Sequence, residues 1–427
     1  MKHWILFPLF FLTASVADAA ESEQYADLPA RETVAAWLSS DAIVREAEGG
    51  RTVAGHEAGM LRASPNEWTV TATGQRRHFE SGGTSHEWNA GMERTIRLPG
   101  KKALDTDLGE QTITVAQARY ADATRQALGE LLQLWLNWCA AAEERRLAEG
   151  QGEIAVANRD AVEKRVRAGD ASKLELNLAE ADLADVERLQ SEARTRESEK
   201  RVRLSARFGD IPPEAPVLSE PVELAESTET LESRLIEHSA ILQIAAAEQS
   251  FAELAVERER AERVPDPTLG AFSASEAYNT ERLVGLSISV PLPGEYRSQK
   301  LGRALGLRDR SEAIVARERQ TVEAESAARI VELRGTLESW QLARRAAERS
   351  EENARLTQRA YSLGEADLQT LLLARRQLLG AQQTTVAAQA SAVAARYRLQ
   401  LDSGVLWADL TPASLRPFEP TPSVPRR

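Results

Sequence analysis

Apolar residues recur along much of the chain at steps of three and four residues, the period of a helix with one buried face. The pattern predicts two unusually long helices, over residues 101–167 and 295–362, each followed by a returning helix. In the first returning segment, 171–208, the apolar positions form a narrow seam suited to coiled-coil packing: Leu176, Ala179, Leu183, Val186, Leu189 and Ala193. A helix of about 67 residues rises ~100 Å, so these segments do not fit a compact globular domain.

The chain is predicted to reverse direction at Gly169 and Gly364, where the long helical patterns stop. Closing a helical hairpin usually needs a residue with positive φ, which glycine adopts without strain. Gly150 is an alternative turn position, but the residue 195 places later is Arg345, a good helix former. If the chain is duplicated, the later glycines are therefore the favoured turns.

Strand-type alternation precedes each long helix. Residues 66–98 contain two alternating runs around the turn-forming pair Gly82 and Gly83, and residues 268–291 contain a third run. Its apolar positions, which alternate with small or polar residues, are Val284, Leu286, Ile288 and Val290. This period is expected where one face of a sheet meets lipid and the other water. Strands of soluble sandwich proteins have the same period, so both environments remain open.

The sequence contains two copies of one unit. Leu98-Pro99-Gly100 recurs as Leu292-Pro293-Gly294 at an offset of 194 residues. Gly169-Asp170-Ala171-Ser172 recurs as Gly364-Glu365-Ala366-Asp367 at an offset of 195. Two markers with almost the same spacing indicate a tandem duplication.

The duplication predicts a domain plan. The first copy is 20–208, with a leading helix at 31–62, a β-hairpin at 66–98 and a helical turn at 168–170. A proline-rich linker at 209–224 cannot continue a helix. The second copy is 225–403, with a leading helix at 226–263, a β-hairpin at 268–291 and a turn at 363–365. The proline-rich tail is 404–427, and its part 412–427 is predicted to be disordered.

The first residues have the pattern of a secretory signal peptide over 1–19. Lys2 supplies a positive charge, an apolar stretch follows over 4–13, and Ala17-Asp18-Ala19 is a small-x-small cleavage site. The apolar stretch is short of the ~20 residues that a bilayer-spanning helix needs, which disfavours the alternative of a membrane anchor. No cysteine follows the cleavage site, so no lipid anchor on an N-terminal cysteine is expected.

Composition agrees with long packed helices. Only 8 Trp, 6 Tyr and 8 Phe occur in 427 residues, which is a thin supply for one large globular core. The net charge of −12 gives no support to a nucleic-acid interface, which needs a concentrated basic face. An anionic ligand could therefore bind only where positive charge is concentrated locally.

Candidates for chemistry are few. His56, His78, His86 and His238 are scattered and do not form a metal-ligand pattern. Cys139 has no partner for a disulfide in its own chain and lies in an apolar helical segment, where burial is more ordinary than reactivity. No phosphate-binding loop and no serine–histidine–carboxylate set is visible. We therefore expect neither an enzyme nor a cofactor or resident metal.

The arrangement resembles the TolC-like outer-membrane efflux proteins. The resemblance is carried by the duplicated organisation, by the hairpin ends 97–101 (Arg-Leu-Pro-Gly-Lys) and 287–293 (Ser-Ile-Ser-Val-Pro-Leu-Pro), and by the turn motifs at 165–175 and 360–368. It covers nearly the whole chain after the signal segment. Each motif is degenerate alone, but their order and spacing are specific.

The resemblance implies a mainly α fold with a small β part. It implies a homotrimer in which tandem long α-helical hairpins form a periplasmic α-barrel, and in which four strands from each subunit close a twelve-stranded outer-membrane β-barrel in lipid. Such a protein lies in the outer membrane of a Gram-negative bacterium with most of its mass in the periplasm. It acts as a passive conduit, and its partners are a periplasmic adaptor and an inner-membrane pump of the RND type.

The resemblance also assigns two groups of positions. The helical-hairpin tips would form the periplasmic gate and adaptor contact, with Gly169, Asp170, Glu175, Gly364, Glu365, Asp367 and Thr370. The barrel-to-helix joints would be Pro99, Gly100, Pro291, Pro293 and Gly294. Family members often carry an aspartate six residues after the tip glycine; here Glu175 and Thr370 stand there, so strong cation selectivity is in doubt. The alternative for Glu175 is a solvated helix face.

Two other classes remain open: a periplasmic adaptor and a purely structural coiled-coil protein. An adaptor would carry one helical hairpin between β-rich domains, and a coiled-coil protein would lack strands at equivalent places in both halves. The joint and tip motifs resemble the heavy-metal cation branch of the family more than the multidrug branch. The cargo stays undetermined, since the pump largely selects it.

Overall fold

The computed structural model describes residues 25–63 and 65–410. The predicted signal segment, and the part of the predicted tail beyond residue 410, lie outside these residues. The described chain divides into two compact units. We call them the hairpin unit (25–44, 124–238 and 323–410) and the sheet unit (45–123 and 239–322, without residue 64).

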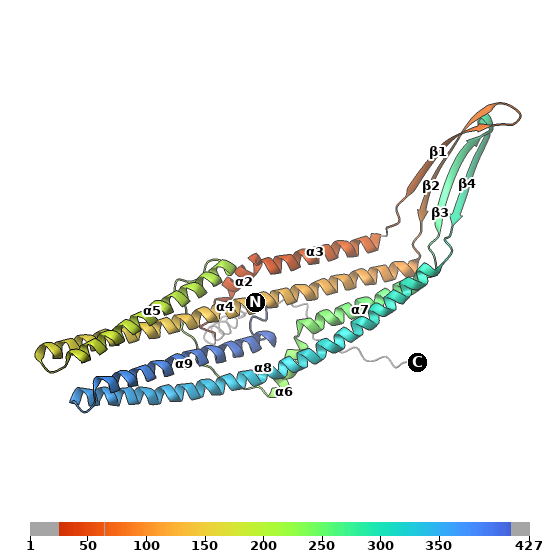
Figure 1. Ribbon diagram of the computed structural model, residues 1–427. Helices are drawn as coiled ribbons and strands as arrows, with labels where there is room; N and C mark the ends of the chain where they lie inside the picture. The colour runs from red at the N-terminus through yellow and green to blue at the C-terminus, as the bar shows by residue number, and fades with distance from the viewer. Residues whose placement is uncertain (1–24, 64, 411–427) are drawn as a thin grey trace, which may run out of the picture. The chain divides into compact units, whose positions relative to one another are not determined.

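The same succession of elements occurs twice along the chain (Figure 1). The first succession is α2 (Arg31–Ser40), α3 (Ala42–Ala63), β1 (Thr69–His78), β2 (Thr84–Thr95), α4 (Pro99–Ala168) and α5 (Lys173–Phe208). The second is α6 (Thr228–Glu237), α7 (Ala240–Ala261), β3 (Thr268–Glu276), η1 (Ala277–Asn279), β4 (Glu281–Ser289), α8 (Glu295–Leu363) and α9 (Leu368–Asp402). The fold is therefore mainly helical with a small sheet, as predicted. No helix among the described residues is both long and apolar enough to cross a bilayer.

Each predicted leading helix is in fact two helices, so that part of the prediction is wrong. Asp41 interrupts the first with an extended backbone, and its Oδ1 accepts hydrogen bonds from the N–H groups of Ile43 and Val44 at 2.8 and 3.2 Å. Ser239 starts α7 in the same way, accepting from the N–H of Leu242 at 3.4 Å. Side chains that cap a helix compete with its continuation, and helical periodicity alone does not register the break.

The four strands form one antiparallel sheet in the order β1-β2-β3-β4. Gly82 and Gly83 turn the first hairpin with positive φ. The second hairpin turns through Ala277, Tyr278 and Asn279, which all have positive φ. Within the described residues, β1 and β4 are edge strands, each paired on one side only.

The register gives the sheet an apolar and a polar face. Directly opposed residues share a face, as do Val70 and Met92, then Met92 and Ala271, then Ala271 and Leu286. The apolar face holds Val70, Ala72, Trp88, Ala90, Met92, Leu269, Ala271, Val284, Leu286 and Ile288. Its side chains are exposed, with Val284 and Leu286 both at 87%. The opposite face is mainly polar and holds Thr69, Thr71, Thr73, Glu87, Asn89, Glu93, Glu276, Ser287 and Ser289, together with the apolar residues Phe272, Ala274 and Leu283.

The hairpin unit has an aromatic core beside the linker. Trp135 and Trp138 are buried with ring centroids 5.3 Å apart, and the indole N–H of Trp135 donates to the carbonyl of Asp27 at 2.7 Å. The Asp27 carboxylate accepts from the N–H of Ser219, in the proline-rich linker, at 2.9 Å. The linker thus packs against the helices of this unit.

Residues 404–410, at the start of the predicted tail, also belong to the hairpin unit. Gly404 ends α9 with positive φ, and the N–H of Val405 donates to the carbonyl of Gln400 at 2.8 Å. Leu406 and Trp407 are buried. This segment therefore contributes to the core of the hairpin unit.

Candidate functional site

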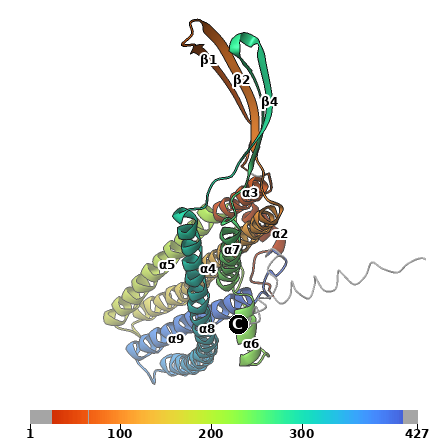
Figure 2. The ribbon, with the colours of Figure 1, turned by 90° about the vertical axis from the view of Figure 1, so that its right-hand side faces the viewer.

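The two helical hairpins of the hairpin unit end in turns of the same construction (Figure 2). Gly169 and Gly364 have φ values of 84° and 78°. The N–H of Asp170 donates to the carbonyl of Arg165 at 2.8 Å, and the N–H of Glu365 donates to the carbonyl of Ala360 at 2.9 Å. These bonds satisfy carbonyls at the helix ends in the way a Schellman motif does. Glycine is favoured at both turns because other residues are strained at these φ angles.

The returning helices start with different caps. In the first hairpin, Ser172 and Glu175 form a capping box: Ser172 Oγ accepts from the N–H of Glu175 at 3.2 Å, and the Glu175 carboxylate accepts from the N–H of Ser172 at 2.9 Å. In the second, Asp367 Oδ1 accepts from the N–H of Thr370 at 2.7 Å. The hydrogen bonds from Thr370 hold the pKa of Asp367 below its usual value. Glu175 and Asp367 therefore both take part in capping the N-termini of the returning helices.

The two tips pack against each other inside the hairpin unit. An apolar cluster joins Val162 and Ala179 of the first hairpin to Leu368, Leu371 and Leu372 of the second. At its border, Arg165 donates to the hydroxyl of Tyr361 at 2.8 Å, and its guanidinium lies 5.2 Å from the centre of that ring. The structure therefore brings the predicted tip residues of both copies to one end of this unit.

Charged groups lie behind this cluster. Arg376 lies 3.6 Å from Asp182 and 3.5 Å from Asp185. Burial raises the pKa of Asp182, although Arg376 and Arg375 act against it. Burial lowers the pKa of Arg375, whose Nη2 donates to Gln358 at 2.5 Å. Sequence reasoning did not identify these residues, because charged residues at helical spacing usually belong to a solvated face.

In the sheet unit, the predicted joints lie where β2 passes into α4 and β4 into α8. Helix α4 begins at Pro99, a position where proline costs no hydrogen bond, and α8 begins directly after Gly294. Neither Gly100 nor Gly294 has positive φ, and a Cβ on either would meet nothing within 4 Å. Backbone geometry therefore gives no reason for glycine at these two positions.

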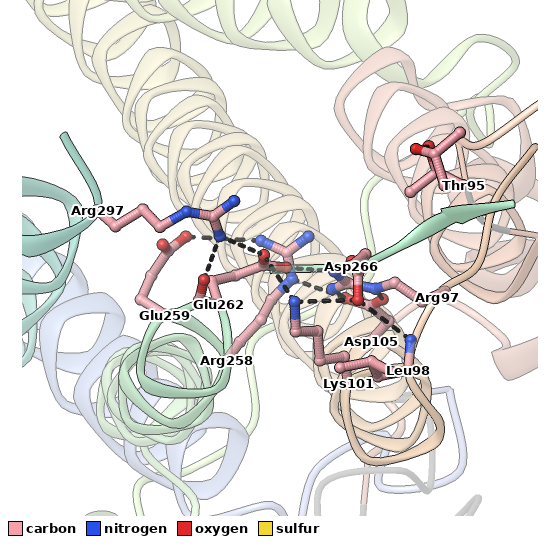
Figure 3. Close-up of polar contacts among 11 residues, drawn as sticks. Thr95, Arg97, Leu98, Lys101, Asp105, Arg258, Glu259, Glu262, Asp266 and Arg297 are labelled. Atoms are coloured by element: carbon pink, nitrogen blue, oxygen red, sulfur yellow. Dashed lines mark hydrogen bonds and ion pairs between the residues drawn. The ribbon is translucent and has the colours of Figure 1, made fainter. Parts of the chain in front are cut away.

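An ion-pair network holds the joint together (Figure 3). Arg97 donates to both carboxylate oxygens of Asp105, at 2.7 and 2.9 Å, and to Asp266 at 2.9 Å; it also pairs with Glu262. Lys101 lies 3.0 Å from Asp266 and 3.3 Å from Glu262. We call Arg97, Lys101, Asp105, Arg258, Glu262, Asp266 and Arg297 the joint network.

The joint network connects the two halves of the chain. Arg97, Lys101 and Asp105 come from the first half, and Arg258 joins them by donating to Asp105 at 2.7 Å. The side chains of Lys101 and Asp105 are only 3% and 4% exposed. Buried charges persist only when they are paired, and here every charged member has at least one partner of opposite sign. Each charge of the network is therefore paired, and Lys101 and Asp105 are buried within it.

The carboxylates of the joint network have lowered pKa values. Burial alone would raise the pKa of Asp105, but the hydrogen bonds from Arg97 and Arg258 outweigh it and bring the pKa below 3.8. The pKa values of Glu262 and Asp266 are lowered in the same way, against the effect of burial, by Arg97 and Lys101. All three groups are thus held in their charged form.

Sequence reasoning located the joint but missed the network. A signal was present: Arg97, Lys101 and Asp105 follow one another at four-residue steps, as do Arg258, Glu262 and Asp266. Residues four apart lie on one face of a helix, but Arg97 precedes the start of α4 at Pro99 and Asp266 follows the end of α7 at Ala261. Only the structure shows that the two trios face each other.

The structure does not bring the cysteine and the histidines together into a reactive or metal-binding site. Cys139 is buried in α4, and burial raises the pKa of its thiol to about 12. Nδ1 of His78 lies 3.0 Å from the Thr84 hydroxyl, and Nδ1 of His238 lies 3.0 Å from the Arg234 carbonyl. In the part of the chain that the structure describes, no three His, Cys, Asp or Glu side chains are grouped to hold a metal ion.

Residues 44–210 match the model of a family described as outer membrane efflux protein. This part of the chain is similar to that family. It is 28% identical over 208 residues to the cobalt-zinc-cadmium resistance protein CzcC of Cupriavidus metallidurans. The alignment covers 48% of this chain and 50% of that protein, so the similarity spans about half the length of the relative.

Solved structures share the fold of this chain. The CmeC outer membrane channel of Campylobacter jejuni has a TM-score of 0.72 at 16% identity, covering 88% of this chain and 85% of that one. The outer membrane protein VceC of Vibrio cholerae has a TM-score of 0.71 at 16% identity, covering 87% and 95%. The similarity of residues 44–210 to the outer membrane efflux proteins agrees with the resemblance that the sequence motifs carry.

Proposed function

We propose that this protein is an outer membrane efflux protein, the channel subunit of a tripartite efflux system. It is a passive conduit that carries solutes from an inner-membrane pump to the exterior. The observation that carries the proposal is the sheet: an exposed apolar face, an opposite polar face and two unpaired edges. An apolar face suits lipid, and a polar face suits a water-filled lumen.

The unpaired edges argue for assembly. Backbone groups at the edges of β1 and β4 have no partner strand in the described chain, and in lipid such groups cost several kcal/mol each. Pairing β1 of one copy with β4 of the next removes the edges. We propose a homotrimer, in which twelve strands close one sheet and the helices of the three copies enclose a periplasmic tunnel.

The tips are proposed as the periplasmic gate and the adaptor contact. Both hairpins turn at the same end of the hairpin unit and carry acidic caps there, at Glu175 and Asp367. The ring of three such ends in a trimer is a suitable contact for a periplasmic adaptor. The adaptor would join the channel to a pump, which we propose is of the RND type.

The cargo is proposed to be heavy-metal cations. The support is the similarity to CzcC, which is named for cobalt, zinc and cadmium resistance. Drug-like solutes are the second candidate, since the fold alone does not separate the two. We propose no metal site for this subunit, which guides the cargo only by excluding it from the membrane and the periplasm.

The test combines membrane fractionation, gel migration and conductance. We expect the full-length protein in the outer-membrane fraction, as an oligomer that resists mild denaturant and dissociates on boiling, and we expect ion conductance when it is reconstituted into planar bilayers. Recovery as a soluble periplasmic monomer would contradict the proposal. For the cargo, deletion of the gene should lower tolerance to zinc, cobalt or cadmium; a loss of drug tolerance alone would favour the second candidate.

A further inference from the structure

The apolar face of the sheet ends in unpaired positive charge near the hairpin turns. Arg76 lies in β1 directly opposite His86 in β2, and Arg282 lies in β4 opposite Ser275. By the register, Arg76, His86 and Arg282 belong to the apolar face, and all three are exposed. Trp88 lies opposite Ser275 on β3, and so in the row of Arg282. We call Arg76 and Arg282 the cationic cluster.

The two faces distribute charge differently. Every carboxylate of the four strands lies on the polar face: Glu87, Glu93, Glu276 and Glu281. Arg77, on that polar face, is neutralised by Glu87 at 3.2 Å and Glu276 at 3.5 Å. Among the described residues, Arg76 and Arg282 have no carboxylate partner. The chain has a net charge of −12, so this face is a local region of positive charge in an acidic protein.

We propose that the cationic cluster binds the phosphate headgroups of anionic lipid in the outer leaflet. The inference rests on the proposed function, in which the apolar face contacts lipid. Arg76 and Arg282 are three strand spacings apart, roughly 14 Å, and two residues apart along the strands. Guanidinium groups bind phosphate oxygens in bidentate geometry, and their position above an apolar band matches the place of a headgroup above its acyl chains.

The opposite end of the apolar face provides an internal comparison. Arg94 lies there, but it is already engaged: its Nε donates to the carbonyl of Asn66 at 2.9 Å, and its guanidinium lies 5.7 Å from the centre of the Trp68 ring. The free cations are therefore confined to the end with the hairpin turns. This polarity favours a headgroup site on one side of the membrane.

Trp88 provides a reporter beside the cluster. In a Trp68→Phe background, Trp88 is the tryptophan of the apolar face, and the other described tryptophans lie outside the strands. Its fluorescence would be measured in full-length protein reconstituted in vesicles that contain brominated phosphatidic acid or brominated phosphatidylcholine. The ratio of quenching by the two lipids reports the local preference for the anionic headgroup.

We expect phosphatidic acid to be preferred by at least about fivefold, the effect of one cation near an anionic surface. The double substitution Arg76→Gln/Arg282→Gln should bring the ratio close to one. Arg76→Lys/Arg282→Lys should retain most of the preference, and Arg94→Gln should leave it unchanged. These positions are exposed or on the sheet surface, so the folded oligomer should persist in all three variants.

Equal quenching by the two lipids in the parent protein, or an unchanged ratio in the glutamine variant, would overturn the inference while leaving the channel intact. If inorganic phosphate removes the preference but chloride at equal ionic strength does not, the cluster binds free anions and the lipid assignment fails. If neither lipid quenches Trp88, the face does not contact lipid, and the proposed function fails together with the inference.

Discussion

Arg97 contacts three carboxylates at the joint, and two of them belong to the other half of the chain. A guanidinium can do this because its donors point in fixed directions within one plane. A lysine at this position would provide a single point of charge and would lose the paired bonds to Asp105. The joint thus depends on the geometry of one side chain as well as on charge.

Removing one carboxylate from the joint network should weaken the fold. In Asp105→Asn, the amide keeps the size of the side chain, but Arg97 and Arg258 lose their shared negative partner in a buried place. We expect a loss of about 2–3 kcal/mol in the free energy of unfolding, seen as a lower thermal midpoint of the purified protein. Asp309→Asn is the matched control, because Asp309 is exposed and pairs with its neighbour Arg308 on the same helix. A midpoint unchanged in both variants would show that the network does not contribute.

The difference in thermal midpoint between the parent protein and Asp105→Asn should become smaller at acidic pH. The pKa of Asp105 in the folded chain is lower than 3.8, so its contribution is complete above that pH and is lost as the pH falls through the folded value. Protonated Asp105 resembles asparagine. We expect the difference in thermal midpoint between parent and Asp105→Asn to be constant near neutral pH and to shrink below about pH 4. A difference that stays constant down to pH 3 would contradict this assignment.

The helical hairpins depend on their turns. Gly169 and Gly364 have positive φ, where a Cβ costs about 1 kcal/mol or more, so Gly169→Ala and Gly364→Ala should each lower stability. Gly150 lies inside α4, and a Cβ there meets nothing within 4 Å. Gly150→Ala should therefore raise stability by about 0.5–1 kcal/mol. The comparison is made by thermal unfolding followed by circular dichroism, and an equal response at all three glycines would contradict the assigned turns.

The two faces of β4 should respond oppositely to charge. Leu286→Arg places a cation on the apolar face and should cost about 2–4 kcal/mol if that face lies in lipid. Ser287→Arg, at the next residue, places it on the polar face and should be tolerated. The readout is the amount of denaturant-resistant oligomer in the outer-membrane fraction. Equal yields of the two variants would mean that the faces do not differ in environment.

The helices and strands could be predicted from the sequence because each type has a characteristic spacing of apolar residues over a few neighbouring positions. The extents of α4 and α8 agree with the predicted 101–167 and 295–362 to within a few residues. The breaks at Asp41 and at Ser239 were missed because the helical spacing of apolar residues continues across them. A helix cap depends on backbone geometry, which this spacing does not report. The joint network was missed because its members are about 160 residues apart, and only the antiparallel pairing of β2 with β3 brings them together.

Edge strands decide how many copies assemble. A chain with two free edges can continue into an open array or close into a ring, and closure alone removes every edge. The twist of a four-stranded unit sets how many units complete the circle. We propose that three copies close the ring. This number can be tested without assuming the strand register between copies.

Cysteine cross-linking distinguishes closure from an open array. In a Cys139→Ala background, Thr73→Cys on β1 would be combined in turn with cysteine at positions 283, 285, 287 and 289 on the same face of β4. At the position that matches the register, oxidation in membranes should give covalent dimers and trimers on denaturing gels and nothing larger. The control pair, Thr73→Cys with Asn89→Cys, joins directly opposed residues within one chain and should give only monomers. A ladder beyond trimer would indicate an open array, and monomers at all four positions would mean that β1 and β4 do not meet between copies.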